Sequence, residues 1–328
     1  MNWINVMKGF AIAAIIYSHS GNQTAHHYLF WFHLPIFLMI SGYLFKRIDK
    51  DQSLIKWIIN KSKRLLIPYV SFGLLTLLLV EIYDPNQYVE SEQIINILKN
   101  DGLGYYYGVY WYIGALFLTL LLFAMLTRYI KSKVIMFTIA SILYVIAHLH
   151  SITQPNLKLP WAAENVPMTA FYFAIGYCLK DIINKFKAYH GLISASIIGI
   201  IVYMEQKGLI KYELDIKASL YNHWVLDIII PLSCAIVFLI ISKWIENSFI
   251  GLGIGELGKA SLSIMYLHIP IMIVLRDHIQ INDLWIATIS LVSSYIIHLI
   301  MMKISPARFL FGIPKIKTIR YDNQSRSA

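Results

Sequence analysis

Two ionisable side chains, Lys8 and His19, lie within one apolar run near the start of the chain. An ionisable group in hydrocarbon costs about 2.5–3.5 kcal/mol on insertion scales, so it marks a functional site by default. In a helix, the spacing of the two residues corresponds to about 16 Å along the axis and about three full turns. Both side chains therefore share a face and could line one cavity across a membrane. The alternative is that Lys8 snorkels to the interface and His19 only caps the helix.

A second group of polar residues follows in the run from Phe32 to Tyr43. His33 lies just before Pro35 at the head of an apolar stretch, where it is either a site residue or an ordinary interfacial histidine. Ser41 and Gly42 would let another helix approach the backbone closely. The sequence has no Gly-x-Ser-x-Gly elbow, so a serine hydrolase has no support.

The elements that must position these residues are membrane helices. Hydrophobic residues make up 58% of the chain and charged residues 14%, and the mean hydropathy is +0.60. Soluble domains have about 45–50% apolar and about 25% charged residues. The composition and hydropathy therefore predict an all-α, polytopic membrane protein with about ten spans. We place these spans at residues 3–20, 28–46, 65–82, 107–127, 134–149, 165–180, 190–205, 222–242, 260–279 and 284–304.

Lysine and arginine fall mostly on one side of these spans, which predicts that both termini are cytoplasmic. The connection between the second and third spans carries Lys46, Arg47, Lys50, Lys56, Lys61, Lys63 and Arg64. The opposite side carries only Lys99, Lys158, Lys207, Lys211, Lys217 and Arg276, scattered among acids. The net charge of +10 thus follows from topology in a cell membrane, and no nucleic acid partner is expected.

The domain organisation is simple. We expect one integral domain, residues 1–310, and a short cytoplasmic tail, residues 311–328. No cleavable signal peptide is expected, because Lys8 interrupts the first apolar run. The two cysteines, Cys178 and Cys234, lie in separate apolar runs, so neither a disulfide nor a metal site is predicted.

The order of these motifs resembles the membrane acyltransferase-3 family, particularly its fucose 4-O-acetylase-like branch. The resemblance covers residues 1–310, and ten spans is also the family's number. The similar segments are the Lys8 and His19 pair and the runs Phe32 to Tyr43, Lys61 to Tyr69, Trp111 to Phe117, Phe171 to Tyr177 and Gly258 to His268. Two positions depart from the family's pattern. Asn5 stands where aspartate is usual, so Lys8 lacks an acidic neighbour unless Asp227 supplies one, and Lys61 stands where arginine is common.

The resemblance implies transfer of an acetyl group from cytosolic acetyl-CoA to a hydroxyl of a cell-surface or exported polysaccharide. No permanently bound cofactor is implied. In that reaction His19 is the candidate general base, since an alcohol near pH 7 needs one. Lys8 would stabilise the thioester carbonyl or a cofactor oxygen, and His33 would share the base role or orient the acceptor.

Binding residues follow from the same resemblance. Lys61 and Arg64 are the candidates for the phosphates of CoA, because they precede the third span on the cytoplasmic side. Ser41, Trp111 and His268 are the candidates for the carbohydrate acceptor. For Trp111 the alternative is an interfacial aromatic belt, and for Ser41 it is helix packing.

Two other classes of function stay open from the sequence. A buried lysine and histidine among ten spans also suit a transporter of a glycan precursor, although no inverted repeat is visible. A non-catalytic membrane subunit that works with polysaccharide assembly proteins is the third possibility. All three share the lipid bilayer and a carbohydrate as partners, and only the acyltransferase also binds acetyl-CoA.

Overall fold

The computed structural model describes residues 2–83, 91–100 and 104–313. Most of the predicted tail, residues 314–328, lies outside this part. The described chain is almost entirely helical, and its one sheet is a short antiparallel pair in which Leu214 lies opposite Tyr221. The elements are α1 (Asn2–Ser18), α2 (Gln23–Phe30), α3 (His33–Leu44), α4 (Leu54–Tyr83), α5 (Ser91–Lys99), η1 (Tyr105–Tyr107), α6 (Tyr110–Tyr129), α7 (Lys133–Thr153), η2 (Pro160–Asn165), α8 (Val166–Leu179), η3 (Ile183–Lys185), α9 (Ala188–Gln206), β1 (Leu214–Asp215), β2 (Leu220–Tyr221), α10 (Leu226–Ile245), α11 (Phe249–Lys259), α12 (Ser261–His278), α13 (Asp283–Lys303) and α14 (Ser305–Leu310).

Within the described ranges, seven helical segments are long and apolar enough to cross a membrane. The pair α11 and α12, bent by 75° at their junction, would make an eighth span. The prediction of an all-α multi-pass membrane protein is therefore confirmed. Each of the ten predicted spans has a helical counterpart, but α1 has 17 residues and α8 has 14, so the number ten stays a prediction.

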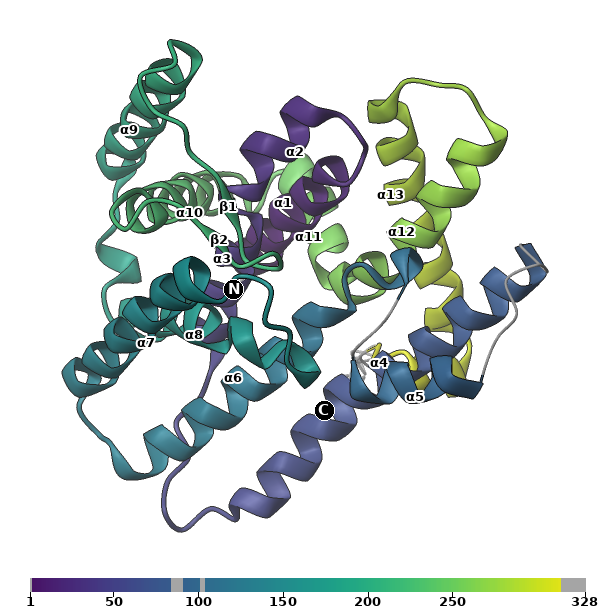
Figure 1. Ribbon diagram of the computed structural model, residues 1–328, viewed down its shortest axis with the longest axis horizontal. Coiled ribbons are helices and arrows are strands. Elements are labelled where there is room, and N and C mark those ends of the chain that lie inside the picture. Colours follow the sequence, from purple (N-terminus) through teal and green to yellow (C-terminus); the bar gives the residue numbers. More distant parts are fainter. Residues whose placement is uncertain (1, 84–90, 101–103, 314–328) are drawn as a thin grey trace, which may run out of the picture.

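The two short helices lie inside the bundle rather than at its edge. Every residue of α8 from Met168 to Tyr177 is buried, and Ile12 and Ile16 of α1 are also fully enclosed. A helix that is apolar on all sides belongs in an interior. Other helices surround α1 and α8 in Figure 1, so the residues at the ends of α1 are held by the core of the molecule.

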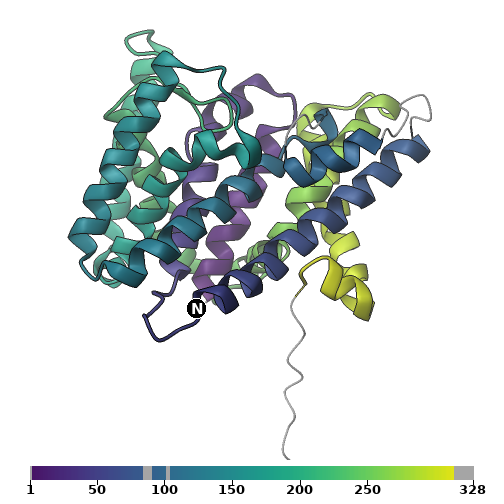
Figure 2. The same cartoon turned by 60° about the horizontal axis from the view of Figure 1, so that its bottom comes forward.

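The cationic connections meet at the face that also holds the N-terminus, which we call the N-terminal face. The Arg128 guanidinium donates to the carbonyl oxygens of Lys50 and Gln52, both at 2.7 Å. The Lys243 ammonium donates to the Ile183 carbonyl at 2.8 Å. In Figure 2 the N-terminus and the connection between α3 and α4 lie at the bottom, and the connection between α12 and α13 lies at the other end, the opposite face. The predicted clustering of cations on one side is thus visible in the fold.

Glycines bring two pairs of helices into backbone contact. A Cβ atom on Gly42 of α3 would lie 1.9 Å from the Phe173 carbonyl oxygen, and one on Gly176 of α8 would lie 1.8 Å from that of Met39. A Cβ on Gly258 of α11 would lie 1.8 Å from the Asn5 carbonyl oxygen on α1. Small residues permit such contacts between membrane helices. The close approach predicted at Gly42 is confirmed, and its partner is α8.

The helix that contains the third predicted span, residues 65–82, begins before that span, since α4 starts at Leu54. The amphipathic stretch from Leu54 to residue 64 is part of the helix, because no residue in it interrupts the backbone hydrogen bonds of the helix. Lys61 and Arg64 therefore project from a helix rather than from a loop. Pro68 lies inside α4 without ending it.

Candidate active site

His19 is the first residue beyond α1, and its ring lies among other aromatic rings. Its backbone N–H still donates to the Ile15 carbonyl at 3.2 Å, so α1 fixes its position. The His19 ring centroid lies 5.5 Å from that of His268 on α12 and 5.6 Å from that of Phe30 on α2. The His33 ring lies 4.8 Å from Phe30. The structure thus brings together three of the predicted site histidines.

The backbone sets the tautomers of His33 and His268. Nδ1 of His33 lies 2.6 Å from the Leu29 carbonyl oxygen, and Nδ1 of His268 lies 3.1 Å from that of Ile264. Because a carbonyl oxygen only accepts, both Nδ1 atoms are assigned the hydrogen, and Nε2 keeps its lone pair. Nε2 of His268 is buried with no hydrogen-bond partner in the described part of the chain. A neutral imidazole with a free Nε2 can accept a proton.

His19 opens into a cavity of about 390 Å³ at the opposite face, which we call the outer cavity. Trp111, one of the candidates for binding the acceptor, also lines it. Three cations that the sequence analysis left without a role lie on its wall: Lys158, Lys217 and Arg276. Arg276 is tied to the base candidate directly, because its Nη2 donates to the His19 carbonyl oxygen at 3.2 Å.

The residues around the outer cavity include strained backbone. Trp161 and Ala162 have φ values of 63° and 53°, and Ser219, two residues after Lys217, has a φ of 58°. Such left-handed conformations in non-glycine residues persist only where the surroundings hold them, and they cluster at functional sites. Here the Ser219 hydroxyl donates to the Asn165 side-chain oxygen at 3.0 Å, so the β1–β2 connection is fixed to η2.

Lys8 lines a second cavity, of about 450 Å³, which we call the inner cavity. Lys61, Arg64 and Ser41 line it too. Throughout the described residues, no carboxylate lies within 4.0 Å of Lys8, Lys61 or Arg64. The inner cavity therefore carries three cations that have no acidic partner among the described residues.

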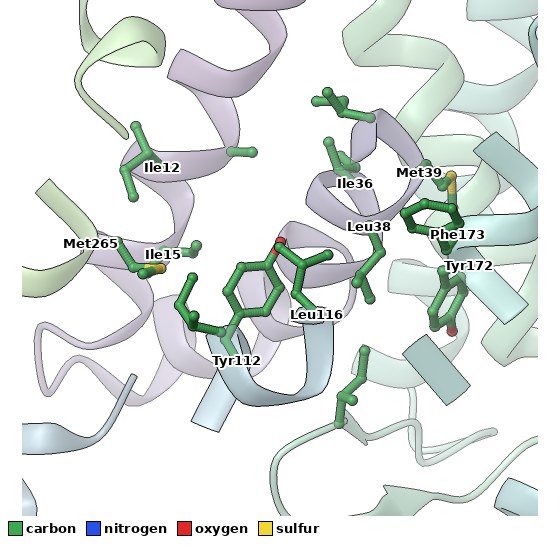
Figure 3. Packing of buried hydrophobic residues seen from close by; sticks show 14 of the residues in the cluster. Ile12, Ile15, Ile36, Leu38, Met39, Tyr112, Leu116, Tyr172, Phe173 and Met265 are labelled. Carbon is green, nitrogen blue, oxygen red and sulfur yellow. The ribbon is translucent and has the colours of Figure 1, made fainter. Parts of the chain in front are cut away.

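The single cavity expected from helix geometry is divided in two by an apolar wall. Ile15, Tyr112 and Met265 lie beside His19 and His33 in a small pocket, while Leu116, one turn after Tyr112, lines the inner cavity. Figure 3 shows Ile15 and Met265 facing Tyr112 and Leu116. The Tyr112 side chain lies near Ser41, which lines the inner cavity. Lys8 and His19 therefore reach opposite sides of one wall.

Two expectations change with these positions. Ser41 lies with Lys8 and Lys61 rather than with Trp111, and its hydroxyl donates to the Phe37 carbonyl at 2.8 Å. An acceptor role for Ser41 therefore gains no support from its surroundings. Asp227 is not the acidic partner of Lys8, because its carboxylate is buried 3.4 Å from Nε2 of His148.

No local pattern in the sequence marks the outer cations as a group. Lys158, Lys217 and Arg276 lie in three connections or helix ends far apart in the chain. Only the folding of η2, the β1–β2 connection and α12 around His19 makes them neighbours. Partial desolvation lowers the pKa of Lys217, and the nearby Asp215 partly offsets this. For metals, the described residues contain no group of three His, Cys, Asp or Glu side chains that could hold an ion.

The fold and the two cavities define a multi-pass helical membrane protein in which an apolar wall separates an outer cavity from an inner one. Residues 1–303 match the family model described as an acyltransferase domain. The chain belongs to the acyltransferase-3 family, which confirms the resemblance at the level of the family; the fucose 4-O-acetylase-like branch stays a prediction. Comparisons with curated proteins and with solved structures found no match.

Proposed function

We propose that the protein is an O-acyltransferase that moves an acetyl group from cytosolic acetyl-CoA to a carbohydrate hydroxyl. The observation that carries this proposal is the pairing of an inner cavity lined by unpaired cations with a histidine on the far side of a thin wall. In this proposal the N-terminal face is cytoplasmic, the protein spans the cytoplasmic membrane, and the acceptor is a cell-surface or exported polysaccharide.

The inner cavity suits the phosphates of CoA. Lys61 and Arg64 lie on neighbouring turns of α4 and face Lys8 across the cavity. Charge-assisted hydrogen bonds from lysine and arginine to phosphate are about twice as strong as neutral ones. This assignment also changes the role of Lys8. By helical rise, Lys8 lies about 15 Å along α1 from Ser18, the residue before His19. Lys8 would therefore bind the donor far from the reacting thioester carbonyl, rather than stabilise that carbonyl.

The outer cavity suits the acceptor. His19 accepts the proton of the acceptor hydroxyl as the oxygen attacks the thioester carbonyl carbon. The carbon–sulfur bond then breaks, the CoA sulfur leaves as a thiolate, and the thiolate takes up a proton. His33 and His268 keep their Nδ1 hydrogens on backbone carbonyls; they hold the pocket around His19 and present a further Nε2 acceptor.

Transfer requires the thioester to pass the wall formed by Ile15, Tyr112, Leu116 and Met265. The pantetheine arm of CoA is narrow and long enough to cover the distance of about 15 Å estimated from helical rise. Displacement of these side chains by the arm would join the two cavities while the donor is bound. Exclusion of water from the joined site protects the thioester from hydrolysis.

The test uses the purified protein in lipid nanodiscs with acetyl-CoA and an oligosaccharide acceptor, and it measures CoA release with a thiol reagent. Loss of a general base lowers turnover by about 10²- to 10⁴-fold, so His19→Ala should nearly abolish release. The control is His278→Ala, since His278 is exposed at the end of α12 and lines neither cavity. Wild-type turnover in His19→Ala would refute the base role. Glycan uptake into vesicles without CoA release would instead favour a transporter.

A further inference from the structure

The outer cavity carries an excess of positive charge that the proposed reaction does not explain. Lys158 lies before η2, Lys217 lies between β1 and β2, and Arg276 lies near the end of α12. All three line the cavity into which His19 opens, and among the described residues the one acidic side chain on the same wall is Glu164. A neutral sugar carries no charge of its own that these cations could bind.

Two of the nearby acids, Glu164 and Asp215, already accept backbone hydrogen bonds. Glu164 is buried, accepts the Leu159 N–H at 3.0 Å and lies 3.9 Å from the Lys158 ammonium. Asp215 accepts the Ala218 N–H at 3.1 Å. In the part of the chain that the structure describes, no carboxylate lies within 4.0 Å of the Lys217 ammonium or the Arg276 guanidinium. Lys217 and Arg276 are therefore the cations available to an incoming anion.

Arg276 is held in place beside the base. Besides its bond to the His19 carbonyl, its Nη1 donates to the Tyr105 hydroxyl at 3.4 Å. Gly21 makes room for it: this residue has a φ of 88°, and a Cβ there would lie 2.7 Å from Nη2. Asp283 lies on the same side, with Oδ1 3.2 Å from that Cβ position. The guanidinium is thus fixed at the residue that carries the candidate base.

Lys217 reaches toward the start of α6. Its Nζ lies 3.8 Å from the position of a Cβ on Gly108, and it lines both the outer cavity and the small pocket that His19 shares with His33. Its own carbonyl oxygen accepts the Lys158 ammonium at 3.3 Å. The two cations therefore flank His19 from different elements, Arg276 from α12 and Lys217 from the β1–β2 connection.

We propose that the outer cavity recognises an anionic carbohydrate, whose carboxylate or phosphate binds Lys217 and Arg276 while a hydroxyl of the same or the adjoining sugar meets His19. This inference rests on the proposed acyl transfer and names the substrate class of its acceptor site. The hydrogen bond from Arg276 to the His19 carbonyl links binding of the anion to the position of the base, because the same guanidinium contacts both.

The test measures binding to the protein in nanodiscs by calorimetry, without acetyl-CoA. The probes are an oligogalacturonate for the carboxylate, a glycerol-phosphate oligomer for the phosphate and a neutral malto-oligosaccharide of equal length. At least one anionic probe should bind wild type about tenfold or more tightly than the neutral probe. Lys217→Gln and Arg276→Gln should each weaken that binding about tenfold and leave the neutral probe unchanged, as expected for a lost charge-assisted hydrogen bond.

Two variants serve as controls. Lys207→Gln removes a cation from the same side of the chain, but Lys207 lies over the Tyr203 ring and does not line the cavity, so anion binding should persist. Lys217→Arg should retain binding, which separates charge from folding. Equal binding of charged and neutral probes, or unchanged anion binding in both glutamine variants, would overturn the inference. CoA release to the anionic acceptor at the wild-type rate in both variants would refute it while leaving the acyltransferase intact.

Discussion

The imidazole rings of His19 and His268, from opposite ends of the described sequence, lie 5.5 Å apart at the outer end of α1. His268 is fully buried, and its Nδ1 is held by the Ile264 carbonyl. Because Nε2 of His268 has no partner among the described residues, this ring can take part in proton transfer or orient the acceptor beside His19.

We expect His268→Ala to lower kcat about tenfold or more and to leave the KM for acetyl-CoA nearly unchanged. The reason is that His268 lies by the outer cavity, away from the cations assigned to the donor, so its loss affects the transition state rather than donor binding. CoA release at varied acetyl-CoA concentration checks this. An unchanged kcat, or a loss confined to the donor KM, would contradict the expected role.

The inner cavity offers a matched pair of lysines. Lys61 lines the cavity, whereas Lys63, two residues further along α4, is exposed and does not. Loss of a charge-assisted hydrogen bond costs about 1.5–3 kcal/mol, so Lys61→Gln and Arg64→Ala should each raise the Kd for acetyl-CoA about tenfold. Lys63→Gln should leave it unchanged. Calorimetry on the nanodisc protein measures all three, and equal effects at Lys61 and Lys63 would point to a diffuse surface charge instead.

A glycine pair tests the packing of the core. A Cβ on Gly176 would lie 1.8 Å from the Met39 carbonyl oxygen, so Gly176→Ala must push α3 and α8 apart; a Cβ on Gly199 of α9 meets nothing within 4 Å. Overpacking costs about 1–3 kcal/mol or more, whereas alanine in a helix interior is favoured over glycine by about 0.5–1 kcal/mol. We expect a lower Tm for Gly176→Ala and an equal or higher Tm for Gly199→Ala. Thermal unfolding in detergent, followed by circular dichroism, distinguishes the two.

The buried pair His148 and Asp227 is expected to hold the fold rather than take part in the reaction. Asp227 lies 3.4 Å from His148 Nε2, and its backbone carbonyl accepts the Tyr172 hydroxyl at 2.6 Å. Removing one partner of a buried polar pair leaves the other without a partner and costs about 1–3 kcal/mol. Asp227→Ala should therefore lower the Tm strongly while the folded fraction keeps both KM values. Selective loss of turnover at full stability would place Asp227 in the reaction instead.

Much of the fold could be predicted from local patterns. The long apolar runs predicted helices in a membrane, and Ser41 with Gly42 predicted a close helix contact that Gly176 completes. Hydropathy does not give the bounds of a helix, however. The third span was predicted from residue 65, because charged residues before it lower the average hydropathy, but the helix that contains it begins at Leu54.

The sequence by itself determined that Lys8 and His19 are a costly pair in an apolar helix, and its motifs pointed to the acyltransferase-3 family. Only the tertiary structure decided that Ile15, Tyr112 and Met265 separate the two, and that Lys217 and Arg276 flank His19. The physical reason is that the patterns that can be read from a sequence are local. Helical period and hydropathy act between residues a few positions apart, whereas a cavity wall is assembled from side chains whose distance in sequence carries no information about their distance in space.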